Sequence, residues 1–84
     1  MTELDDTART KIWADLMKRF SQDGESINVT KADLRAAVDA LDSYLDDNAG
    51  DINNALPNPA KSELTQSQKA LLLSYVVLKR YEVI

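Results

Sequence analysis

The sequence of 84 residues contains no cysteine and no histidine. Without cysteine the chain forms no disulfide and offers no thiolate to a metal. Without histidine it has no imidazole for acid–base chemistry near neutral pH, no Ser-His or Cys-His nucleophile pair, and no histidine ligand for zinc, copper or haem. The carboxylates and lysines that remain are scattered along the chain. We therefore expect no enzymatic activity, no catalytic residue, no bound metal and no cofactor.

The sequence also lacks an excess of basic residues. It has 10 Lys and Arg against 14 Asp and Glu, which gives a net charge of −4. This balance argues against direct nucleic-acid binding, because that function needs a basic surface to displace counterions from phosphate. The charges are unevenly placed: residues 30–59 carry two basic against six acidic residues, and residues 60–84 carry four against two. The middle of the chain is acidic and its C-terminal part is basic.

Long hydrophobic runs are absent as well. The longest apolar stretch, Ala70–Leu78, is interrupted by one serine and is about half of the roughly 20 residues that cross a bilayer. No secretory signal peptide is recognisable. We expect no membrane association and no small-molecule substrate, and a chain that acts inside a cell or in a particle assembled there.

A first helix is predicted over residues 3–21. Apolar residues recur there at a spacing of four, which forms one stripe on a helix. Thr2 and Asp5 favour a helix start, and Gly24 supplies a stop. The stripe consists of Leu4, Ala8, Ile12, Leu16 and Phe20, flanked by Trp13 and Met17.

Two further long helices are predicted over 31–47 and 66–82. Thr30 with Asp33, and Thr65 with Gln68, have the spacing of a capping box at a helix start. A short helix is predicted over 51–56, and Pro57 and Pro59 end it because proline cannot donate a backbone hydrogen bond. Residues 57–64 then form a connector, with one helical turn at Ala60–Leu64.

These elements predict an all-α fold, a single helical domain over residues 1–84 built as a small bundle of three main helices plus a short connector turn. The three long helices share one core. Its predicted members are Ile12, Trp13, Leu16, Phe20, Leu34, Val38, Leu41, Leu45, Leu72, Leu73 and Val76.

Residues 20–38 resemble a calcium-binding loop only superficially. If Asp23 and Gly24 take the fifth and sixth loop positions, Arg19 takes the first and Thr30 the twelfth. A cation at the first ligand position and no carboxylate at the last would abolish calcium binding.

The last predicted helix is apolar on two opposite sides, which two neighbouring helices would cover only in part. A contiguous exposed apolar surface is typical of an interface. We expect Leu71, Tyr75 and Leu78 to lie in a protein–protein interface. We also expect the basic end of this helix, Lys79 and Arg80, to meet an acidic row on the next copy. That row consists of Asp39, Asp42 and Asp46.

Residues 31–80 resemble small, mostly uncharacterised proteins of tailed bacteriophages. The shared features are a helix reading L-x-A-A-V-D-A-x-D at Leu34–Asp42, an N-x-A-L-P-x-P connector at Asn53–Pro59, and an L-T-x-x-Q-K start of an apolar helix at Leu64–Leu72. Such proteins are often encoded among virion structural genes. The resemblance implies a structural or assembly role without catalysis, and it brings no established functional residues.

Two functions follow as hypotheses. In the first, the chain is a virion component in several copies, bound to the capsid, the neck or an appendage base, with copies of itself or other virion proteins as partners. In the second, it is a phage-encoded intracellular adaptor or inhibitor that binds a basic host protein through its acidic middle helix. The first needs a permanent apolar interface, whereas the second depends on carboxylates and would be sensitive to salt.

Overall fold

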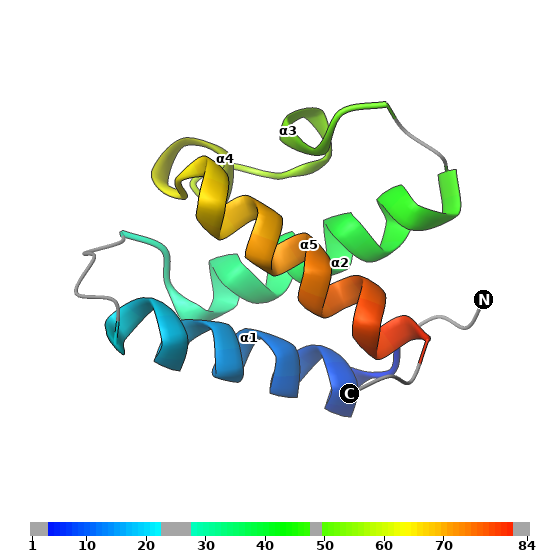
Figure 1. Ribbon diagram of the computed structural model, residues 1–84, viewed down its shortest axis with the longest axis horizontal. Helices are drawn as coiled ribbons and strands as arrows, with labels where there is room; N and C mark the ends of the chain where they lie inside the picture. Colours follow the sequence, from blue (N-terminus) through cyan, green and yellow to red (C-terminus); the bar gives the residue numbers. More distant parts are fainter. Residues whose placement is uncertain (1–3, 23–27, 48–49, 82–84) are drawn as a thin grey trace.

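The computed structural model describes residues 4–22, 28–47 and 50–81. Three long helices, α1 (Asp6–Gln22), α2 (Lys31–Asp47) and α5 (Gln66–Arg80), are joined by two single-turn helices, α3 (Ile52–Ala55) and α4 (Ala60–Glu63) (Figure 1). No strand occurs in these described ranges. The predicted all-α class, with three main helices, is confirmed.

The three long helices form a compact bundle in which each one contacts the other two. In Figure 1, α5 crosses α2 at a steep angle and α1 runs along one edge of the view. The two short helices lie at the opposite edge, where both contact α2. One helix, α2, is therefore in contact with every other element.

Both predicted capping boxes are formed. The backbone N–H of Asp33 donates to Thr30 Oγ1 at 3.1 Å, and the Thr30 N–H donates to Asp33 Oδ2 at 3.3 Å. At the start of α5, the Gln68 N–H donates to Thr65 Oγ1 at 3.1 Å, and the Thr65 N–H donates to Gln68 Oε1 at 2.9 Å. Each box satisfies helix N–H groups that otherwise have no partner. The predicted bounds of 31–47 for the middle helix are confirmed.

The outer ends of the first and last helices differ from the prediction. The first helix begins at Asp6 and not near residue 3, because the Asp5 carboxylate accepts a hydrogen bond from the Ala8 N–H at 2.7 Å and so caps the helix there. The predicted N-cap Thr2 lies outside the described residues. The last helix ends at Arg80, and Tyr81 is its C-cap residue. Residue 82, the predicted end, also lies outside the described ranges.

The buried apolar side chains form one cluster between the three long helices. Of the predicted core, Trp13, Leu45 and Leu73 are only partly buried and pack against its edge. The Trp13 ring faces outward enough for the ammonium of Lys31 to lie 5.8 Å from its centroid, a cation–π arrangement. The fully buried members are Leu4, Ile12, Leu16, Phe20, Val29, Leu34, Ala37, Val38, Leu41, Leu56, Ala60, Leu64, Leu72 and Val76.

The connector between α2 and α5 contributes side chains to the core. Leu56, Ala60 and Leu64 are each at most 4% exposed, and they bring the connector down onto the bundle. Helix α3 has Asp51 as its N-cap and Leu56 as its C-cap, so the predicted helix at 51–56 is present with its two end residues as caps. The Asn58–Pro59 peptide bond is cis.

Candidate protein-docking surface

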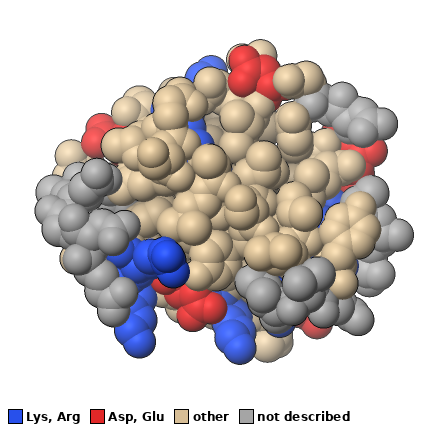
Figure 2. Space-filling model, in the orientation of Figure 1, with Lys and Arg blue, Asp and Glu red and all other residues tan. Residues whose placement is uncertain are grey.

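The outer side of α5 is free of charge in its central part. Its exposed positions between the two ends are Ala70 and Ser74, and its first turn adds Gln66 and Ser67. In Figure 2 uncharged residues fill the centre of the face over α5, and charged side chains lie mainly toward the rim. This is the side of the molecule on which the sequence predicts an interface.

The three apolar residues predicted for that interface share one flank of α5. Leu71, Tyr75 and Leu78 follow each other at spacings of four and three, so they lie on one side of the helix. All three are partly buried, and Leu71 and Tyr75 pack in part against the core. The fully buried stripe, which includes Leu72 and Val76, lies next to this flank. The flank therefore combines support from the core with accessible apolar surface.

The charged residues predicted for the interface have a different location from the one expected. Arg80 and Asp42 are buried, with side chains 1% and 2% exposed, and they form an ion pair within the chain. Arg80 Nη1 lies 2.8 Å from Asp42 Oδ1 and donates to the Asp42 backbone carbonyl at 2.5 Å. The predicted pairing of Arg80 with the acidic row of the next copy is thus replaced by pairing with the same chain. The reason is the crossing of α5 over α2, which places the last turn of α5 against residues 42–46.

The rest of the acidic row is also engaged within the chain. Asp46 Oδ1 accepts from Arg80 Nη2 at 2.5 Å, and Asp39 Oδ1 lies 2.9 Å from Arg9 Nε. The side chains of Asp39 and Asp46 remain 52% and 44% exposed. The three carboxylates therefore divide into one buried member, Asp42, and two that stay at the surface beside an arginine.

Arg9 is the member of this cluster that the sequence did not indicate. Its Nη2 donates to Asp42 Oδ2 at 2.8 Å, and the same oxygen accepts from the Leu4 N–H at 3.3 Å. Asp42 thus holds together α1, α2 and α5 from its place in the middle of α2. We name the buried residues Asp42 and Arg80, together with Arg9, whose side chain is 23% exposed, the buried charge cluster. The sequence signal for this cluster is the position of Asp42. It follows Leu34 and Val38 at spacings of eight and four, so it lies on the same side of α2 as these apolar residues.

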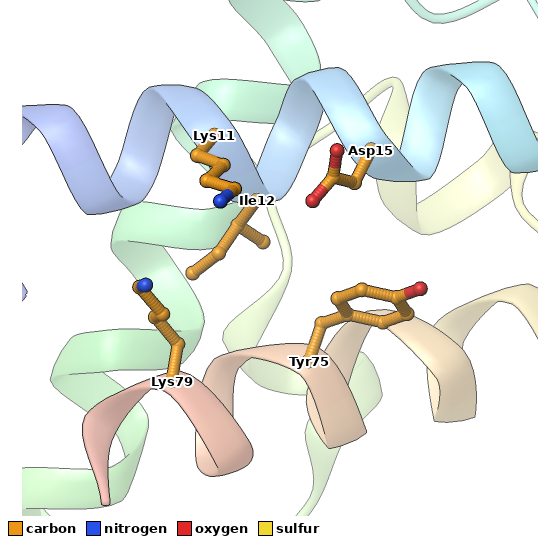
Figure 3. Close-up of a pocket in the computed structure, with 5 residues that line it drawn as sticks. All are labelled: Lys11, Ile12, Asp15, Tyr75 and Lys79. Carbon is orange, nitrogen blue, oxygen red and sulfur yellow. The ribbon is translucent and has the colours of Figure 1, made fainter. Parts of the chain in front are cut away.

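A small hollow of about 170 Å³ lies between α1 and α5. Figure 3 shows Lys11, Ile12 and Asp15 extending from α1, and Tyr75 and Lys79 extending from α5 to meet them. The two ammonium groups face each other at one end, over the buried Ile12 side chain, and the Asp15 carboxylate and the Tyr75 ring lie at the other end. Two of the residues predicted for the interface, Tyr75 and Lys79, therefore line this hollow.

Within the part of the chain that the structure describes, no group of three or more acidic residues is arranged to hold a metal ion. None of the helices there is long and apolar enough to cross a membrane.

The fold and this surface define a small helical bundle with one uncharged face. Comparison of the chain with protein-family models, with curated proteins and with solved structures gives no match.

Proposed function

We propose that this chain is a protein-docking module without enzymatic activity, and that it is a structural or assembly component of a tailed-bacteriophage virion. The observation that carries the docking proposal is the flank Leu71, Tyr75 and Leu78 beside the uncharged outer side of α5. The virion assignment is supported by the resemblance of residues 31–80 to phage proteins. Under this proposal the partners are copies of the chain or other proteins of the particle.

The energetics of the flank favour a repeated contact. Complete burial of three large apolar side chains contributes about 1.5–3 kcal/mol each, and these three are already partly buried in the free chain. Association costs remove much or all of this gain. A single patch of this size therefore suits a contact that is repeated in many copies, where each docked unit raises the effective concentration of the next.

The alternative function, an adaptor that binds a basic host protein through α2, has weaker support. Asp42 is buried and cannot contact a partner, and Asp39 and Asp46 are already paired with Arg9 and Arg80. A basic partner would have to compete with these arginines for the same carboxylates.

The docking proposal predicts the behaviour of a double variant, Leu71→Ser with Leu78→Ser. Both changes remove accessible apolar surface, so the variant should lose assembly into larger species while its far-ultraviolet circular dichroism stays that of the parent. Leu73→Ser is the matched control, because Leu73 is also partly buried on α5 but lies on the other flank. It should assemble like the parent.

Two outcomes would contradict the docking proposal. One is assembly of the double variant at the parent's level. The other is loss of helix content in the double variant together with normal assembly of Leu78→Lys, a change confined to the border of the flank. The virion assignment is tested separately, by mass spectrometry of purified particles, which should contain this chain in several copies; its absence from them would overturn the assignment.

A further inference from the structure

The hollow between α1 and α5 has the chemistry of a carboxylate site. Lys11 and Lys79 bring two positive charges to one end, and the buried Ile12 side chain forms an apolar floor beside them. A carboxylate seated at the lysine end would be shielded in part from water by the Ile12 side chain, which strengthens its attraction to the ammonium groups. Asp15 at the far end has the same sign as the incoming group and would direct it to the lysine end.

A matching negative feature exists on the same chain, at the carboxyl end of α2. Asp46 and Asp47 are both exposed there, Asp46 is paired with Arg80 of the same chain, and the last turn of α2 contains no basic residue. Asp47 is therefore the carboxylate that this end of α2 offers to a partner. The helix dipole adds partial negative charge at this end. Tyr44 and Leu45, just before the two acids, are partly buried and supply apolar surface next to them. The carboxyl end of α2 therefore exposes an acidic residue next to apolar side chains, and α2 does not line the hollow. We name this end of α2, with Asp47, the acidic tip.

We propose that the hollow between α1 and α5 of one copy receives the Asp47 side chain, at the carboxyl end of α2 of a second copy, between Lys11 and Lys79. This inference rests on the proposed function and specifies its partner. A second copy is the occupant because both members of the complementary pair, the basic hollow and the acidic tip, belong to this chain. The contact joins two different surfaces, so it is head-to-tail and closes into a ring or continues as an array.

The charged residues in this contact are not the ones that the sequence predicts for the interface. Arg80 and Asp42 stay inside each copy as part of the buried charge cluster. Lys11, which is exposed on α1, takes over the role expected of Arg80, and Asp47, which is exposed on α2, takes over the role expected of Asp42.

A charge exchange tests this contact. Sedimentation velocity over a range of concentrations gives the self-association constant of the parent, of Lys11→Glu, of Asp47→Lys and of the chain with both changes. Each single change places like charges opposite each other and should weaken self-association about tenfold or more. The double change restores opposite charges between positions 11 and 47 but leaves Lys79 facing a like charge, so it should recover only part of the lost association and still bind more tightly than either single variant. Raising the salt from low to physiological ionic strength should weaken the parent's association.

Matched controls keep the test specific. Lys18→Glu alters another exposed lysine on α1, and Glu63→Lys alters an exposed acid on α4. Both residues lie outside the proposed contact, so both variants should associate like the parent. Circular dichroism of every variant should show the parent's helix content.

Three results would overturn the inference and leave the docking proposal intact. In the first, Leu71→Ser with Leu78→Ser abolishes self-association but the two single charge variants do not. In the second, the double charge variant stays as weak as the single ones. In the third, the parent remains monomeric at millimolar concentration yet is found in purified particles, which makes a different protein the occupant of the hollow.

Discussion

Arg80 and Asp42 are a charged pair that lies in the interior of the bundle. The Asp42 carboxylate accepts from Arg9 of α1 and from the backbone N–H of Leu4, and it forms an ion pair with Arg80 of α5. The Asp42 backbone carbonyl accepts a hydrogen bond from Arg80. Taking charges out of water is costly, and the attraction between them offsets that cost only when the geometry is good and the remaining polar atoms are bonded. The cluster therefore defines how the three helices cross more than it adds net stability.

Removal of one member should reveal the cost of an unpaired buried charge. Arg80→Met leaves Asp42 buried with a single arginine, so the free energy of unfolding should fall by about 3 kcal/mol. Urea unfolding followed by circular dichroism measures this. The matched control is Arg35→Met: Arg35 pairs with Asp6 at 2.6 Å, but the two side chains are 40% and 82% exposed. That change should cost no more than about 1 kcal/mol. Equal losses in the two variants would show that burial does not determine the strength of these pairs.

The pairing of Asp42 with Arg80 within one chain could not be predicted from the sequence. Asp42 and Arg80 are separated by 38 positions, and their meeting depends on the angle at which α5 crosses α2. A local pattern shows on which side of its own helix a residue lies, but not which residue of another helix will face it. The sequence could therefore suggest that these residues form an ion pair, but it could not decide between a pair within the chain and a pair between copies.

The predicted helices agree with the structure wherever a local signal defines them. The capping boxes at Thr30 and Thr65 are local hydrogen-bond arrangements that can be recognised from four residues, and the helices that follow begin where predicted. The predicted start of the first helix near residue 3 is wrong, because it takes Thr2 as the N-cap whereas the Asp5 carboxylate caps the helix in the structure.

The burial of the connector between α2 and α5 was not predicted from the sequence. Proline spacing indicates where α3 ends, but burial of Leu56, Ala60 and Leu64 depends on contacts with distant helices. These three residues recur at a spacing of four, but Pro57 and Pro59 interrupt the helix between them, so the spacing does not define the face of one helix. The connector is thus anchored by three apolar side chains in addition to its prolines.

Replacement of an anchor should destabilise the bundle as a core substitution does. Leu64→Ala removes a side chain that is 4% exposed, so the free energy of unfolding should fall by about 2–4 kcal/mol. Lys61→Ala, at an exposed position of the adjacent α4, should stay within about 0.5 kcal/mol of the parent. Both values come from urea unfolding. If Leu64→Ala is as stable as Lys61→Ala, the buried Leu64 side chain does not anchor the connector.

Across the whole molecule the outer side of α5 is uncharged over its centre, whereas α1 exposes residues of both signs, including Lys11 and Asp15, and α2 ends in two exposed acids. A net charge of −4 would oppose association of identical chains at long range. In the proposed contact the pairing of Asp47 with Lys11 and Lys79 offsets this repulsion at short range. A head-to-tail contact between identical chains requires such a local pairing of unlike charges.

Hydroxyl-radical footprinting can show whether the flank formed by Leu71, Tyr75 and Leu78 is covered when the chain assembles. Side-chain modification is measured in the monomeric chain and in its assembled form, with Trp13 as an internal reference on the opposite side of α1 from the hollow. Modification of Leu71, Tyr75 and Leu78 should fall on assembly while that of Trp13 stays constant. If modification of these three residues is unchanged in the assembled form, the flank is not an interface.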